Sequence, residues 1–437
     1  MKKIDFNYGE FVYSEKLDNG IIVYMYPTTK SKNFYITVST HFGAEVMKYR
    51  SGSKVYDVTK GSAHFLEHRV MDFTKNKDAM DEINKLGSIA NAYTTYNGTN
   101  YNIYGEENIL ENIRLLFDRV FKADIKKEDV ESERGIILEE YYMYQTDPYF
   151  KAQTTLFDNV FNKSFIKSLV IGTEEGIKSV TCEELNRLYK DFYTPENMFI
   201  VVTGNFDKES VLDYIKDYMK SVKIKNTSAL IVRPKEEYKV NVSYAEVSKD
   251  ILEAKVVIGY KIKVGKGSKL NTRIMLEMVI SENFGKTGKS YLRLMNEGLN
   301  RFDYFTEEVD DYLILVFTAS TNSVDKFEKI VNEELSSLEF TTESLDRKKK
   351  GYISNLILSF EDIVNVEDMI TTNILCYNKL LNKMGDVVRE YKLSDVKDVI
   401  KLIDINNKSV LVMKKWRFFY VFFKKCIIFK IYTWFIE

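Results

Sequence analysis

Two histidines four residues apart, with a glutamate between them, constrain this chain more than any other feature. His64 and His68 are two of only three histidines in 437 residues, and Glu67 lies between them. Residues four apart share one face of a helix, so the two imidazoles can bind one Zn²⁺ through neutral nitrogens. Glu67 lies one turn from His64, where its carboxylate can reach water held by the metal. The pattern predicts a helix over residues 61–74, with Ser62 as its N-cap. The alternative is an amphipathic helix with fortuitous histidines.

The length and composition indicate a globular protein of two or three domains. The chain has 437 residues, of which 45% are hydrophobic and 29% charged. A formal net charge of −1 argues against nucleic-acid binding. Cys182, Cys376 and Cys426 form no Cys-x-x-Cys pair, which indicates a reducing compartment. We find no signal peptide and no apolar run of membrane-spanning length, so a cytoplasmic location is expected.

The order of predicted elements indicates an α+β protein with two domains. Asn19-Gly20 predicts a hairpin, and residues 88–94 and 99–105 read as paired strands around Asn97-Gly98. A lysine-rich stretch separates two halves whose patterns of elements are similar. The predicted division is a first domain over 1–222, a linker over 223–246, a second domain of the same architecture over 247–413 and an aromatic, basic tail over 414–437. The role of the tail is open; contact with a membrane surface is possible but not expected.

A catalytic zinc site needs three protein ligands and one open position, so a third ligand is required. The third histidine, His41, ends a predicted strand and is interpreted as structural. The best candidates are acids on a predicted helix over 126–144. Glu133 and Glu140 are seven residues apart and share one face, but spacing alone cannot choose between Glu139 and Glu140. The alternative is that these acids are solvated surface charges.

The motif and its surroundings resemble a known family. His-Phe-Leu-Glu-His is the inverted zincin motif, and the chain resembles the pitrilysin and insulin-degrading enzyme family, most of all its short, mitochondrial-processing-peptidase-like bacterial branch. In that family a glutamate about seventy residues downstream completes the zinc site. Glu140 follows His68 by 72 residues, and Glu133-Arg134 before it matches the family pattern, which favours Glu140 over Glu139. Other resembling stretches are Asn91-Ala92-Tyr93-Thr94, Gly172-Thr173-Glu174-Glu175 and Tyr193-Thr194-Pro195.

The resemblance implies a zinc endopeptidase. One Zn²⁺ per chain would be held by His64, His68 and Glu140, with Glu67 as general base and Glu133 supporting the ligands or the water. The implied fold is two similar domains, each a mostly antiparallel sheet packed with helices, facing across a peptide-binding chamber. Substrate would add a strand to a sheet edge, where Asn91 and Ala92 would contact its backbone. The alternative function is a non-catalytic peptide-binding or assembly subunit of a two-subunit processing peptidase.

The second half departs from the family pattern in a way that bears on partners. Active short members use an arginine and a tyrosine there to hold substrate. The matching positions read as Lys289 and Arg301, unless the region is misaligned and Tyr304 takes the tyrosine's place. Lysine cannot make the planar two-pronged contact of arginine. The chain also resembles one half of the long family members, so we expect a homo- or heterodimer with a same-fold subunit that supplies the missing contacts.

Overall fold

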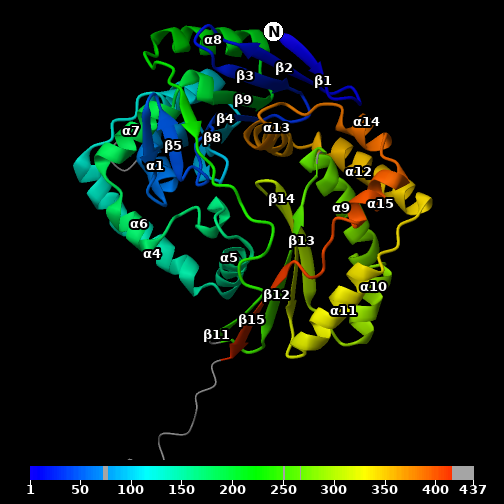
Figure 1. The fold of residues 1–437 in the computed structure, drawn as a ribbon. Helices are drawn as coiled ribbons and strands as arrows, with labels where there is room; N and C mark the ends of the chain where they lie inside the picture. The colour runs from blue at the N-terminus through cyan, green and yellow to red at the C-terminus, as the bar shows by residue number, and fades with distance from the viewer. Residues whose placement is uncertain (72–76, 250, 266, 416–437) are drawn as a thin grey trace, which may run out of the picture.

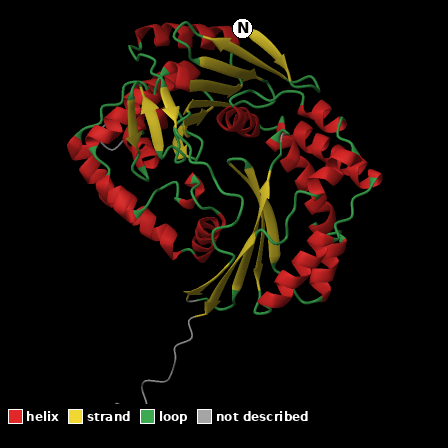
Figure 2. Cartoon of the chain, in the orientation of Figure 1, coloured by secondary structure: helices red, strands yellow, loops and turns green. Residues whose placement is uncertain are grey.

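The structure, a computed structural model, describes residues 1–71, 77–249, 251–265 and 267–415, which include two large sheets (Figures 1 and 2). The seven-stranded sheet has the order β1-β2-β3-β9-β4-β8-β7, in which only β3 and β9 pair in parallel. Its strands are β1 (Lys2–Asp5), β2 (Phe11–Lys16), β3 (Ile22–Pro27), β4 (Phe34–Thr40), β7 (Ile89–Thr94), β8 (Thr99–Gly105) and β9 (Met198–Gly204). The predicted hairpin is present between β2 and β3, and Gly20 has the positive φ of 106° that such a turn needs.

The second half builds a five-stranded sheet with the order β11-β15-β12-β14-β13, in which only β11 and β15 are parallel. Its strands are β11 (Tyr244–Lys249), β12 (Lys255–Lys263), β13 (Phe302–Val309), β14 (Tyr312–Ser320) and β15 (Lys408–Lys415). A small sheet joins β10 (Ala229–Ile231), β5 (Lys48–Ser51) and β6 (Lys54–Asp57). The segment predicted to be a linker therefore pairs with both halves, through β10 and β11. The predicted domain boundaries stay a prediction.

The helices form two groups around the sheets. In the first half they are α1 (Ser62–Val70), α2 (Lys77–Lys85), α3 (Ile109–Val120), α4 (Lys127–Thr146), α5 (Pro148–Val160), α6 (Glu174–Ser179), α7 (Cys182–Phe192) and α8 (Lys208–Ser221). In the second half they are α9 (Lys269–Phe284), α10 (Lys289–Asn296), α11 (Val324–Ser336), α12 (Thr342–Ser359), α13 (Ile363–Tyr377), α14 (Met384–Arg389) and α15 (Leu393–Ile400). Short 3-10 turns lie at Phe165–Lys167 and Pro195–Asn197.

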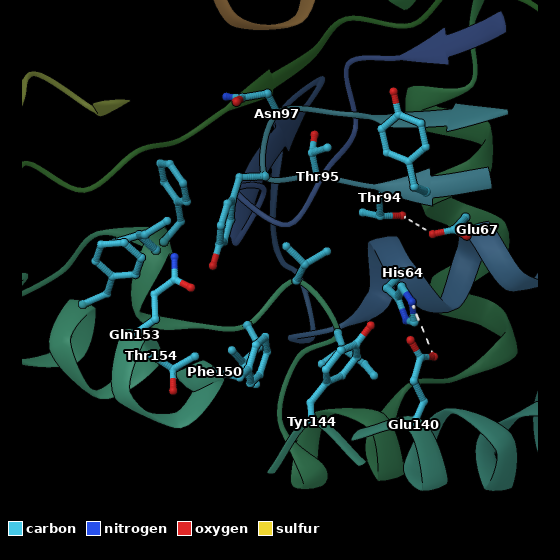
Figure 3. A pocket seen from close by; sticks show the side chains of 18 of the residues that line it. His64, Glu67, Thr94, Thr95, Asn97, Glu140, Tyr144, Phe150, Gln153 and Thr154 are labelled. Atoms are coloured by element: carbon cyan, nitrogen blue, oxygen red, sulfur yellow. Dashed lines mark hydrogen bonds and ion pairs between the residues drawn. The ribbon is translucent and has the colours of Figure 1, made fainter. Parts of the chain in front are cut away.

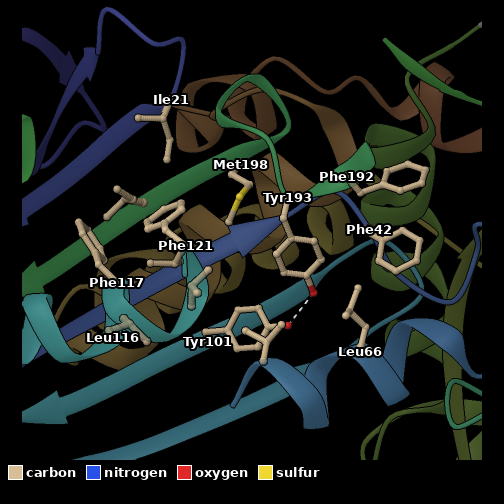
Figure 4. Close-up of a cluster of buried hydrophobic side chains, with 14 of the residues drawn as sticks. Ile21, Phe42, Leu66, Tyr101, Leu116, Phe117, Phe121, Phe192, Tyr193 and Met198 are labelled. Atoms are coloured by element: carbon tan, nitrogen blue, oxygen red, sulfur yellow. Dashed lines mark hydrogen bonds between the residues drawn. The ribbon is translucent and has the colours of Figure 1, made fainter. Parts of the chain in front are cut away.

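Alternation along the strands gives each large sheet two buried faces. In β9, Ile200 and Val202 face the main core of the first half, where helices such as α1 and α3 pack (Figure 4). Within that core the hydroxyls of Tyr101 and Tyr193 are 2.6 Å apart, so the buried phenols satisfy each other. Phe199 of the same strand points to the opposite face. Full burial of an apolar side chain such as Ile200, Val202 or Phe199 contributes about 1.5–3 kcal/mol to the stability of the fold.

The opposite face of each sheet is covered by a helix from the other half. Helix α13, from the second half, packs on β9 and β4 of the first sheet. Helix α5, from the first half, packs on β12 and β15 of the second sheet through side chains such as Leu156 and Val160. Neither sheet can therefore bury both of its apolar faces without the other half.

A buried ion pair anchors the end of α5 to the second sheet. The Nζ atom of Lys261 on β12 lies 2.7 Å from Oε1 of Glu236, and both side chains are almost completely buried. Glu236 also accepts hydrogen bonds from the backbone N–H groups of Asn162, Lys163 and Ser164, just after α5. Removing one partner of such a pair leaves the other charge buried and unpaired, which lowers the free energy of unfolding by about 3–5 kcal/mol.

No helix in the described ranges is long and apolar enough to cross a membrane. The predicted tail falls mostly outside them, because β15 ends at Lys415 and residues 416–437 are not described.

Candidate active site

Helix α1 begins at a glycine rather than at the predicted serine cap. Gly61 is the N-cap residue, with a left-handed φ of 94°, and Ser62 is the first helical residue. The predicted cap was wrong because the chain turns where it meets the loop at Ile171: a Cβ on Gly61 would lie 2.5 Å from the carbonyl oxygen of Ile171. The described helix ends at Val70, and residues 72–74 of the predicted range lie outside the described residues.

The structure brings His64, His68 and Glu140 together. The centroids of the imidazole rings of His64 and His68, both on α1, lie 4.6 Å apart. The Oε2 atom of Glu140, on α4, is 3.7 Å from Nε2 of His64 and 3.6 Å from Nε2 of His68 (Figure 3). These separations exceed a good hydrogen bond and are close to the roughly 3.3 Å between tetrahedral ligands at zinc bond lengths. The three donors therefore fit a metal ion.

The neighbouring acid and the third histidine lie outside this cluster. Glu139 is exposed and is not among the residues whose donor atoms converge. His41 packs its ring 5.6 Å from that of Phe199. Of the two acids that spacing left open, the geometry brings Glu140 to the histidines.

Glu133 supports the cluster from behind. Its Oε1 lies 2.9 Å from Nδ1 of His68, and its Oε2 accepts a hydrogen bond of 2.7 Å from Nη1 of Arg69. With Nδ1–H directed at a carboxylate, neutral His68 presents the lone pair of Nε2 to the cluster. The role of Arg69 was not predicted, because nothing in its spacing distinguishes it from a surface arginine.

Glu67 lies beside the cluster, buried on α1. Its Oε2 accepts a hydrogen bond of 2.7 Å from the hydroxyl of Thr94 on β7. Burial raises the pKa of the Glu67 carboxyl, which the Thr94 hydrogen bond partly offsets. The sequence analysis missed Thr94, although strand alternation placed it on the same face as Ala92.

The pKa values of the two histidines are shifted in opposite directions. Burial and the neighbouring imidazole lower the pKa of His64 to about 4. Burial also acts to lower the pKa of His68, but the carboxylates of Glu133 and Glu140 outweigh it and raise the pKa to about 9. The neighbouring imidazole of His68, together with that of His64, lowers the pKa of Glu140. Without a metal, a proton on His68 therefore occupies the place of a cation.

The cluster lies on the wall of a cavity of about 760 Å³ (Figure 3). The cavity is bounded by β7 and the turn after it, by α4 and α5, by the segment from Phe165 to Ile171 and by β13 of the second sheet. Aromatic and aliphatic lining side chains predominate, among them Tyr96, Tyr144, Phe150, Phe157, Phe165, Ile166 and Leu169. The cavity is large enough for several side chains of a peptide.

Asn91 and Ala92 lie on β7, the last strand of its sheet. The backbone N–H of Ala92 donates a hydrogen bond of 2.9 Å to Oδ1 of Asn91, so this N–H is not used in pairing with β8. Ala92 lines the cavity, whereas Asn91 is exposed. The edge therefore offers backbone groups to an added strand.

The second-half candidates lie elsewhere. Lys289 begins α10 and pairs with Glu339 at 2.8 Å. Arg301 pairs with Glu253. Neither residue lines the cavity, and neither does Tyr304.

Comparison with known proteins places the chain in a family. Residues 50–174 match the family model described as Insulinase (Peptidase family M16), and residues 179–352 match the one described as Peptidase M16 inactive domain. The chain is 26% identical over 412 residues to the uncharacterized zinc protease YmfH of Bacillus subtilis, an alignment that covers 90% of this chain and 94% of that protein.

Solved structures share the fold. A putative M16-like peptidase from Alicyclobacillus acidocaldarius superposes with a TM-score of 0.88 at 21% identity, covering 94% of this chain and 100% of that one. The periplasmic protease PqqL from Escherichia coli gives a TM-score of 0.76 at 18% identity, covering 95% of this chain but 48% of that one.

The matching family models, the relatives and the two-domain fold place the chain in a family of metallopeptidases. The chain belongs to the insulinase family, peptidase family M16. The predicted α+β fold with two similar domains and the suspected family are both confirmed.

We expect Glu140→Gln to lower zinc content sharply and Glu139→Gln to leave it unchanged. Of these two carboxylates, that of Glu140 converges with the two imidazoles, and even supporting partners of metal ligands contribute about 10–100-fold in affinity. Metal analysis after dialysis of the purified variants measures this. Equal zinc loss from both variants would show that the ligand is misassigned.

We also expect zinc affinity to rise with pH by about tenfold per unit up to near pH 9. His68, with its pKa raised to about 9, is protonated at neutral pH in the metal-free protein and must lose that proton to bind zinc, whereas His64 is already neutral. Competition with a chromophoric chelator at several pH values measures the slope. Glu133→Gln removes a carboxylate that raises the pKa of His68, so its slope should be shallower. An affinity independent of pH between about 7 and 9 would contradict this account.

Proposed function

We propose that this chain is a zinc-dependent endopeptidase that hydrolyses peptides or unfolded segments bound as an added strand along β7. The observation that carries the proposal is the convergence of His64, His68 and Glu140, with Glu67 beside them, on the wall of a cavity. An open sheet edge borders the same cavity. Zinc proteases among the relatives support this activity.

The chemistry assigns a separate task to each residue. His64, His68 and Glu140 would hold one zinc ion, which when bound acts as a Lewis acid on the scissile carbonyl and lowers the pKa of water. Glu67 accepts the proton of the attacking water and then delivers it to the leaving amine. The Thr94 hydroxyl fixes the Glu67 carboxylate in place.

Substrate recognition would follow from the edge strand. Backbone N–H and C=O groups of β7, around Asn91 and Ala92, pair with any extended peptide, whatever its sequence. In the structure, Oδ1 of Asn91 accepts the hydrogen bond from the N–H of Ala92. A carbonyl group of the bound peptide would take its place. Such an enzyme selects extended or unfolded segments that fit the cavity.

A second candidate function is a non-catalytic, peptide-binding or assembly subunit. The description of the family model that matches residues 179–352 as an inactive domain favours it. Subunits that only bind have no need for a general base, so the presence of Glu67 between two convergent histidines supports the catalytic proposal.

The decisive variant is Glu67→Gln. We expect it to retain zinc and to lose peptide cleavage by about 10²–10⁴-fold or more, because glutamine keeps the size and the Thr94 contact but cannot accept a proton. Cleavage of a quenched fluorescent peptide and metal analysis of the same preparation measure both properties. Wild-type turnover with full zinc would refute the role of Glu67.

We further propose that the chain acts with a second subunit of the same fold. This chain aligns with about half of E. coli PqqL, so a longer family member contains roughly two such lengths. Lys289 and Arg301 are engaged in exposed ion pairs away from the cavity, which supports a contribution from a partner. A related chain of the same fold without the histidine motif would supply the missing contacts, because a second copy of this chain carries the same Lys289 and Arg301.

We expect the purified chain alone to be folded and zinc-loaded but weak on peptides, and its activity to rise when a same-fold chain lacking the motif is added. Light scattering reports the assembly, and initial rates report the activity. Strong cleavage by the isolated monomer, unaffected by Lys289→Ala or Arg301→Ala, would contradict the proposal.

A further inference from the structure

The cavity beside the cluster has an unusual charge pattern. Its described lining residues include four carboxylates but no lysine or arginine. Two of these acids, Glu67 and Glu140, belong to the cluster end already described. The other two, Glu307 and Glu308, come from β13 of the second sheet. These two acids differ in what surrounds them.

Glu308 forms an ion pair and a hydrogen bond with neighbouring residues. Its Oε1 lies 3.0 Å from Nε of Arg273 and accepts a hydrogen bond of 2.8 Å from the hydroxyl of Tyr377. Glu307, in contrast, makes no hydrogen bond or ion pair with any residue in the described ranges. The charge of Arg273 acts on Glu307 without forming an ion pair, and Glu307 also borders an adjoining cavity that Arg273 lines. Of the four carboxylates that line the cavity beside the cluster, Glu307 is the one outside the cluster that makes no hydrogen bond or ion pair with a described residue.

Strand alternation places Glu307 against the aromatic wall. Phe305 and Val309, two residues before and after it, pack in the apolar cluster formed by α5 and the second sheet. Tyr96 and Phe165 belong to the same cluster and line the cavity, with ring centroids 5.4 Å apart. Although the Glu307 side chain is accessible from the cavity, the surrounding protein desolvates it enough to raise the pKa of its carboxyl. A cation brought beside it would recover the lost solvation.

We propose that Glu307 is a specificity residue that pairs with a cationic group of the bound peptide. Lysine and arginine match the surroundings, because an apolar stem can lie along Tyr96 and Phe165 while the charged end reaches the carboxylate. A free amino terminus offers the same charge without the stem. The inference rests on the proposed function, since it takes the cavity as the peptide site, and it names the substrate class: peptides with a basic group at one fixed distance from the scissile bond.

The test is a positional scan with quenched fluorescent peptides. A single lysine is moved through otherwise neutral sequences, and each peptide is paired with one that carries norleucine, which has the same stem length and no charge. We expect lysine to exceed norleucine in kcat/KM by about tenfold at one position. Glu307→Gln should reduce that ratio to within about twofold, and Glu307→Lys should favour glutamate at the same position. Acetylation of the amino terminus tests the other source of charge: a fall in kcat/KM on acetylation that disappears in Glu307→Gln would place the cation at the amino terminus.

The matched control is Asp303→Asn. Asp303 lies on the same face of β13, four residues earlier, is exposed and does not line the cavity. Its substitution removes one negative charge from the same strand and should leave the lysine preference unchanged. Equal loss of the preference in both variants would indicate a general field effect and overturn the assignment. Retention of the full preference in Glu307→Gln would overturn it as well, as would a wild-type chain whose rate depends neither on the lysine nor on a free amino terminus.

A binding measurement keeps this inference separate from the peptidase activity. In a Glu67→Gln background, fluorescence anisotropy compares the affinity of the lysine and norleucine peptides with and without Glu307→Gln. A lysine preference that depends on Glu307 in binding supports the inference even if no peptide is cleaved, in which case the proposed function alone fails. Cleavage by the wild-type chain without a Glu307-dependent preference in either assay refutes the inference alone.

Discussion

The exchange of helices between the two halves is the constraint on which the rest of the structure depends. Each large sheet has two apolar faces, and its own half covers only one of them. Helix α13 covers the second face of the first sheet, and α5 covers the second face of the second sheet. Separating the halves would expose both faces to water, at about 25 cal/mol for each square ångström of apolar surface. The relative position of the sheets is thereby held by the hydrophobic effect.

This arrangement also shapes the cavity. Helix α4 carries Glu140 towards α1, and α5 follows it directly on the way to the second sheet. Beyond α5, Glu236 and Lys261 hold the start of the segment that contributes Phe165 and Leu169 to the cavity wall. Burial of the apolar sheet faces of both halves therefore fixes the elements that surround the cavity. These elements are the helix that carries Glu140, the segment that contributes the apolar wall, and the edge strand of the second sheet.

Within the cluster, geometry and electrostatics serve the same end. The four hydrogen-bonding groups of Glu133, Arg69, Thr94 and Glu67 hold the side chains that would otherwise rotate. Glu133 orients His68 and keeps a cation favourable at Nε2, either as a proton or as a metal. Burial keeps His64 neutral and ready to bind a metal. On the second sheet, Glu307 lines the same cavity without a hydrogen bond or ion pair to a described residue, which is why it is assigned to the substrate.

The sequence by itself determined the local chemistry of this protein. The spacing of His64 and His68 places both rings on one helix face because the α-helix has 3.6 residues per turn, and Asn-Gly at positions 19–20 specifies a hairpin because it tolerates positive φ. The family resemblance singled out Glu140, which spacing alone could not separate from Glu139. Tertiary structure decided what no local pattern encodes: the glycine that begins α1 against Ile171, the hydrogen bond from Thr94 to Glu67, and the crossing of α5 and α13 between halves. These features join residues far apart in sequence, and burial of apolar surface selects them only once the whole chain has packed.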